Sequence, residues 1–65
     1  MRILVNGVWR ETAGPGLAAL LEELGYGGRI VSTAVNGEFV AVAERARTAL
    51  TEGDRLEVLA PMQGG

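Results

Sequence analysis

Two short runs near the N-terminus have the hydrophobic, β-branched and aromatic residues that are typical of β-strands. Residues 2–5 (RILV) and 8–11 (VWRE) are rich in strand-forming residues and are separated by Asn6-Gly7. Asn-Gly between two such runs is the strongest short hairpin signal, because both central residues of a type I′ turn need a positive φ. We therefore predict an antiparallel hairpin over residues 2–11.

The two faces of this hairpin should have different roles. Because side chains of a strand alternate with a period of two, three aliphatic residues share the face that we expect to contact the core: Ile3, Val5 and Val8. Leu4 and Trp9 then lie on the opposite face. For Trp9, core packing and a surface that a partner contacts are about equally compatible with the pattern.

A stripe of leucines predicts the main helix. Four of them recur at spacing i, i+3, i+4 and i+7: Leu17, Leu20, Leu21 and Leu24. Gly25 follows as a helix-ending glycine. Pro15 could be the first helical residue behind a Gly14 cap, or could stand directly before a Gly16 cap. One short helix with one apolar face is suited to cover one face of a sheet.

A second hairpin is predicted in the middle of the chain. Residues 30–35 are strand-like, Asn36-Gly37 repeats the turn signal, and residues 38–40 begin the return strand. Residues 41–51 are less clear, and we expect a turn or short helix near residues 45–50. Gly27-Gly28 follows a helix instead of leading into one, which argues against a phosphate-binding loop.

The final predicted strand covers residues 55–60. Alternation directs Leu56 and Val58 toward the core and Glu57 and Leu59 away from it. We predict that Leu59 joins Leu4 and Trp9 in an apolar patch on the sheet face opposite the helix, where a partner protein binds.

The strand leads into residues 61–65 (PMQGG), which we expect to form a free tail on a domain of residues 1–60. Pro61 cannot donate to a sheet ladder, so pairing should stop there. Five extended residues reach about 17 Å, and glycine passes through a channel too narrow for a side chain. The α-carboxylate of Gly65 would be the reactive group at the tip.

The order hairpin, helix, hairpin, turn and final strand predicts an α+β fold. One helix would pack on one face of a mixed sheet of four to five strands, which is the β-grasp plan. The last strand would pair parallel with the first in the centre of the sheet. The tail would then extend a strand that has neighbours on both sides.

The composition excludes most kinds of chemistry in the chain itself. Its 65 residues contain no Cys, His or Lys, and the net charge is −2. These absences remove thiolate nucleophiles, Schiff-base lysines, and the commonest general base and metal ligand. We expect no catalytic residues, no metal, no bound cofactor, no nucleic-acid or membrane partner and no signal peptide, and hence a cytoplasmic protein that is not an enzyme.

Several segments, in this order, resemble the ThiS/MoaD family of ubiquitin-like sulfur carriers, within it the thiamine-pathway branch. They are MRILVNG at 1–7, LLEEL at 20–24, AVNGEFV at 34–40, EGD at 52–54 and the glycines at 64–65. The resemblance covers nearly the whole chain. It implies a ubiquitin-like β-grasp fold and a protein that carries sulfur as a C-terminal thiocarboxylate.

The resemblance also implies the partners and the modified residue. An adenylyltransferase of the ThiF type would use ATP and Mg to adenylate Gly65, and would read Met62, Gln63 and Gly64. Sulfur would come from a cysteine desulfurase, directly or through an intermediary. A thiazole synthase of the ThiG type would then take the sulfur from the Gly65 thiocarboxylate.

Other functions remain compatible with the sequence. Within the same chemistry, the chain could be the small subunit of molybdopterin synthase, although those chains are usually longer, or a carrier for tRNA thiolation or cysteine synthesis. It could instead be a ubiquitin-like modifier that forms isopeptide bonds through Gly65. A third class is an interaction domain with an inert tail. Detection of a thiocarboxylate would select the carriers.

Overall fold

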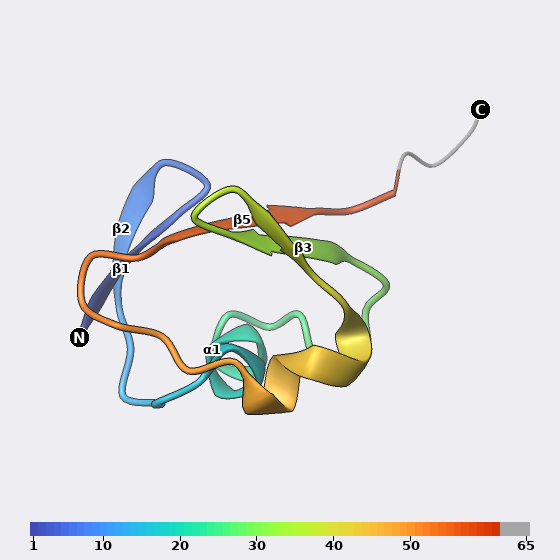
Figure 1. Cartoon of the computed structure of the whole chain (residues 1–65), viewed down its shortest axis with the longest axis horizontal. Helices are drawn as coiled ribbons and strands as arrows, with labels where there is room; N and C mark the ends of the chain where they lie inside the picture. Colours follow the sequence, from blue (N-terminus) through green and yellow to red (C-terminus); the bar gives the residue numbers. More distant parts are fainter. Residues whose placement is uncertain (62–65) are drawn as a thin grey trace.

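A five-stranded mixed sheet with helices on one face forms the fold in the computed structural model, which describes residues 1–61 (Figure 1). The elements in chain order are β1 (Arg2–Val5), β2 (Val8–Glu11), α1 (Leu17–Glu23), β3 (Ser32–Val35), β4 (Glu38–Val40), the 3₁₀ helix η1 (Val42–Arg47) and β5 (Arg55–Leu59). The strands lie in the order β2-β1-β5-β3-β4. The predicted α+β architecture is therefore confirmed, with five strands.

Strand β5 occupies the centre of the sheet. It runs parallel to β1, with Val5 opposite Leu56, and antiparallel to β3, with Ser32 opposite Leu59. Beyond Leu59 the chain continues through Ala60 to Pro61, outside any strand. The chain thus leaves the sheet from its middle strand, as predicted (Figure 1).

The two Asn-Gly turns each hold β5 with a side chain. Asn6 and Asn36 have φ of 48° and 50°, and the glycines after them are also positive, as a type I′ turn requires. The Asn6 amide donates to the Val58 carbonyl at 3.1 Å and accepts from the Val58 N–H at 2.8 Å. The Asn36 side chain accepts from the Arg55 N–H at 2.9 Å. Both turns therefore act as clamps on the strand that carries the tail.

Asn36 has a second partner at the start of β5. Its amide donates to the Asp54 carboxylate at 3.0 Å, and the Thr51 N–H donates to the same carboxylate at 2.8 Å. The hydrogen bond from Asn36, followed by that from the Thr51 backbone, lowers the pKa of Asp54 below its ordinary value. These bonds fix the turn that precedes β5.

The Asn6 clamp can be tested with Asn6→Asp, since Asp-Gly also forms type I′ turns. The variant keeps the acceptor for Val58 but replaces the amide donor with a carboxylate that faces the Val58 carbonyl. We expect a loss of about 1–3 kcal/mol in the free energy of unfolding at pH 7, measured in urea. The deficit relative to wild type should shrink below about pH 4, where the protonated carboxyl can donate again. A variant as stable as wild type at pH 7 would contradict the clamp.

The core lies between the sheet and the helices. Nine apolar residues form it: Ile3, Val5, Leu17, Leu20, Leu21, Val31, Leu50, Leu56 and Val58. The predicted leucine stripe supplies three of these residues, and Leu24 packs against them half-buried. Gly16 is the N-cap of α1, so Pro15 precedes the cap, and Gly25 ends the helix with φ +87°.

Two sequence predictions about apolar residues are wrong. Val8 shares the face of Ile3 and Val5, but it is exposed, because it lies on the outermost strand and the core includes no residue of β2. The strand predicted from Ile30 begins only at Ser32. Val31 is nevertheless buried, whereas Ile30 is exposed.

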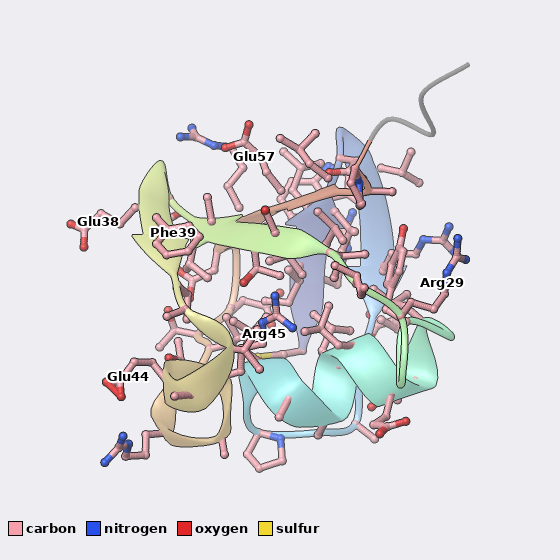
Figure 2. All side chains as sticks on the ribbon, turned by 90° about the vertical axis from the view of Figure 1, so that its right-hand side faces the viewer. Arg29, Glu38, Phe39, Glu44, Arg45 and Glu57 are labelled. Atoms are coloured by element: carbon pink, nitrogen blue, oxygen red, sulfur yellow. The ribbon has the colours of Figure 1, made fainter. Side chains whose placement is uncertain are left out.

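The segment of unclear structure contains η1, which begins at Val42, three residues before the expected turn or helix. Arg45 anchors it to the sheet. Its Nε donates to Thr33 Oγ1 at 3.2 Å and its Nη2 donates to the Val31 carbonyl at 2.6 Å. Figure 2 shows Arg45 between the sheet and α1. Neither helix in residues 1–61 is long and apolar enough to span a membrane.

Candidate functional site

The face of the sheet opposite α1, called the outer face below, contains the three predicted surface residues. Leu4 lies opposite Trp9 in the β1–β2 pair, and Leu59 follows the same alternation on β5. Leu4 is partly exposed, Trp9 is half exposed and Leu59 is 68% exposed. The structure therefore places all three side chains where the sequence predicted, although binding at this face stays a prediction.

Phe39 extends the outer face toward the other edge, and sequence reasoning missed it. It lies opposite Ala34, which in turn lies opposite Glu57 of β5. Phe39 is 72% exposed. The signal was available, because the two-residue turn at Asn36 fixes the register of β4. Phe39 is thereby placed on the side of Ala34.

Charged residues interrupt the apolar outer face. The Arg2 guanidinium lies over the Trp9 ring, 4.7 Å from its centroid, and covers part of it. Glu57 lies on the central strand β5, opposite Ala34 of β3. Figure 2 shows its side chain on the side of the sheet away from the helices. A protein that covers this face therefore needs apolar side chains and a hydrogen-bond donor for Glu57.

The predicted reactive tail follows Pro61 in the sequence. Pro61 is the last residue that the structure describes, and the predicted site residues Met62, Gln63, Gly64 and Gly65 lie outside the described residues. What the described chain contributes is the direction of departure, because β5 is held by strands on both sides and by Asn6. The position at which the tail begins is thus fixed to the body.

Within residues 1–61, no group of three or more acidic residues could hold a metal ion. An open groove of about 530 Å³ beside β4 and η1 includes Glu38, Glu44 and Asp54. Glu44 is paired with Arg47, and Asp54 is held by Asn36 and Thr51. The carboxylates of Glu44 and Asp54 are therefore engaged in local structure.

Comparison with known proteins identifies the family. The model of the ThiS family matches residues 3–65, nearly the whole chain. The chain belongs to the ThiS family. The predicted resemblance is therefore confirmed, and the matched region includes the two glycines at 64–65.

A solved structure and a curated relative agree with the ThiS assignment. The crystal structure of the thiamine biosynthesis protein ThiS from Geobacter metallireducens matches with a TM-score of 0.83 and 29% identity, covering 100% of both chains. A thiazole synthase from Paramagnetospirillum magneticum is 38% identical over 66 residues. That match covers 100% of this chain but only 20% of the relative, so the chain spans about a fifth of that protein.

These matches confirm the β-grasp fold and support the expected role. The ThiS assignment is that of a small sulfur carrier and not of an enzyme. This agrees with a chain that contains no Cys, His or Lys. The ThiS-like segment within a thiazole synthase also associates this kind of domain with thiazole formation in that relative.

Proposed function

We propose that this protein carries sulfur for the formation of the thiazole ring of thiamine, as a thiocarboxylate on Gly65. The observation that carries the proposal is the match over the full length of both chains to a thiamine biosynthesis ThiS structure. The family match through residue 65 and the exit of the chain from central strand β5 support the role of Gly65.

The first step activates a carboxylate that nucleophiles do not otherwise attack. A carboxylate oxygen of Gly65 attacks the α-phosphorus of ATP, bound with Mg²⁺ by an adenylyltransferase of the ThiF type, and pyrophosphate leaves. The acyl adenylate has AMP as its leaving group. Gly64 would lie in a narrow channel of the enzyme, and the walls of this channel would contact and recognise Met62 and Gln63.

The second step transfers sulfur. The terminal sulfur of a persulfide, supplied ultimately by a cysteine desulfurase, attacks the acyl carbon and AMP leaves. A thiol then reduces the acyl disulfide and releases the Gly65 thiocarboxylate. Thiazole synthase takes the sulfur, and addition of water to the acyl carbon restores the carboxylate. The proposal sets these reactions in the cytoplasm, where ATP is available.

The described residues have two roles in this proposal: they position the start of the tail, and they provide the surface that the partner enzyme recognises. Strand β5 holds the start of the tail in a fixed position, so the active-site channel receives a substrate that is already oriented. Because the chain contains no Cys, no thiol of the carrier itself can attack the acyl adenylate or the acyl disulfide at Gly65. The outer face would dock against the partner.

Mass spectrometry of the intact protein from its own host tests the proposal. Replacement of one terminal oxygen by sulfur adds about 16 Da at Gly65, and deletion of the host's adenylyltransferase should abolish this form. The same spectrum reports whether Gly65 carries a free carboxylate. A protein that never gains sulfur while thiamine is being made would contradict the proposal.

The predicted docking surface is tested by Leu59→Asp. Because Leu59 is exposed on the outer face, the change should leave the thermal midpoint within a few degrees of wild type. Burial of a new carboxylate in the interface should weaken binding to thiazole synthase by about tenfold or more, measured by calorimetry. Unfolding of the variant, or unchanged affinity, would show that Leu59 has a different role.

A further inference from the structure

A shallow hollow surrounds the point where the described chain leaves the sheet. It has a volume of about 290 Å³ and is lined by four residues: Arg29, Ile30, Ala60 and Pro61. We call these residues the collar. Ile30 and Arg29 come from the loop between α1 and β3, while Ala60 and Pro61 follow β5. The alignment of Ser32 with Leu59 brings the two segments together.

Ile30 is the most exposed large hydrophobic residue in residues 1–61, at 83%. Its neighbours on both sides are fixed. Val31 is buried in the core and its carbonyl accepts a hydrogen bond from Arg45, while the Arg29 N–H donates to the Tyr26 carbonyl at 3.0 Å. Ile30 is therefore held in an outward position by an ordered segment. It contributes nothing to the core, which leaves its apolar surface for a partner.

Arg29 gives the collar a positive charge. Figure 2 shows it at the end of the molecule where the chain leaves the sheet. Its guanidinium lies 6.0 Å from the centroid of the Tyr26 ring, and no carboxylate of residues 1–61 lies within ion-pair distance. The chain as a whole has a net charge of −2. The collar thus combines an unpaired guanidinium with an exposed aliphatic side chain.

An enzyme that acts on Gly65 has to come close to the collar, because Gly65 is only a short distance from Pro61. Gly65 is the fourth residue after Pro61, and four extended residues span at most about 14 Å. An enzyme that acts on Gly65 inside a channel must therefore bring the rim of that channel against the residues around Pro61. The collar includes Pro61, and Leu59 of the outer face directly precedes its residue Ala60 in the chain.

We propose that the collar docks on the rim of the tail-binding channel of thiazole synthase, with Ile30 in an apolar depression and Arg29 against a carboxylate. The inference rests on the proposed function and names a recognition surface for it. Thiazole synthase is the partner because a relative with that function contains a segment 38% identical to this chain. In that relative the ThiS-like segment and the rest of the thiazole synthase belong to one polypeptide, which keeps the two close together.

The test titrates thiazole synthase from the same host with the full carrier chain and its variants. Ile30→Asp and Arg29→Glu should each weaken binding by about tenfold or more, as expected for central interface residues. Ile30→Ala, which removes the apolar side chain without adding charge, should also weaken binding. Raising the salt concentration should reduce the effect of Arg29→Glu, because salt screens charge pairs, and should leave the effect of Ile30→Ala unchanged. Circular dichroism and thermal melts check that each variant folds.

Two controls match these changes in chemistry but lie elsewhere. Val8→Asp places the same charge on an apolar residue that is 55% exposed on edge strand β2, opposite Val5 and outside the hollow that the collar lines. Arg10→Glu reverses an exposed arginine on edge strand β2. Both should bind thiazole synthase within about twofold of wild type, since they lie outside the interface.

The outcomes separate this inference from the proposed function. If wild type acquires sulfur and binds thiazole synthase but the collar variants bind equally well, the collar is not the docking surface and the carrier function stands. Weaker binding to the adenylyltransferase alone would also overturn the inference. If wild type neither binds thiazole synthase nor acquires sulfur, both proposals fail.

Discussion

Leu56→Ala is expected to leave much of the chain unfolded at 25 °C. Leu56 lies on β5 between Val5 and Val35 and is completely buried. Truncation of a buried leucine to alanine costs about 2–5 kcal/mol, because the lost transfer free energy adds to that of the cavity. A domain of this length has a total stability of roughly 3–10 kcal/mol, at about 0.05–0.15 kcal/mol per residue. One such cavity can remove most of it.

The same strand provides the matched control. Leu59 is three residues away on the opposite face and is 68% exposed, so Leu59→Ala removes the same atoms without a core cavity. Urea denaturation followed by circular dichroism should show a large decrease in the midpoint for Leu56→Ala. The midpoint for Leu59→Ala should stay near that of wild type. Equal effects of the two changes would mean that β5 does not have the face assignment seen here.

The result also bears on function, because stability and presentation depend on the same strand. β5 joins the two halves of the sheet and continues toward residues 62–65. A variant without a fixed β5 would still have the glycines at 64–65 but would lose the body that positions them. We therefore expect Leu56→Ala to lower sulfur loading in proportion to the unfolded fraction.

The sequence predicted the strands and the main helix well where local chemistry decides them. Both predicted Asn-Gly turns formed, since few dipeptides adopt two positive φ angles easily. The leucine stripe specified both the helix and its buried face. In these segments local preference and tertiary packing agree.

Predictions failed where the answer depends on what covers a residue. Val8 has the alternation of a core residue, but an edge strand beyond the core leaves it exposed. The 3₁₀ helix η1 has no buried residues, and the weak apolar spacing of this segment predicted a turn or short helix near residues 45–50 instead of 42–47. It is held by Arg45, whose bonds to Thr33 and the Val31 carbonyl join segments that only the folded chain brings together.

The residues of the candidate site also differ in whether local sequence pattern alone could place them. Leu4, Trp9 and Leu59 could be placed on the outer face by alternation within single strands, and the structure places them there. Phe39 required the register between strands, and Ile30 required the loop before β3 to be placed beside the end of β5. The tail itself is recognised from its sequence alone, and its chemistry is tested by changes to the tail.

Addition of one alanine after Gly65 is expected to abolish adenylation without affecting the fold. The change keeps a terminal carboxylate, its charge and every residue of the described body. It moves the carboxylate by about 3.5 Å and adds a Cβ beside the carbon that would be activated. A displacement of about 1 Å from near-attack geometry can cost about 100-fold in rate. The extended protein should therefore melt like wild type yet fail in ATP–pyrophosphate exchange with its adenylyltransferase.

Gly64→Ala separates the steric requirement from the position of the carboxylate. It leaves the carboxylate of Gly65 at its original distance from the body and adds only a methyl group inside the proposed channel, so impaired exchange would have a steric cause. An inert tail predicts no exchange with wild type or either variant. If wild type and the extended chain are adenylated at the same rate, the enzyme does not recognise the position of the Gly65 carboxylate. Gly65 would then not be the site of sulfur transfer.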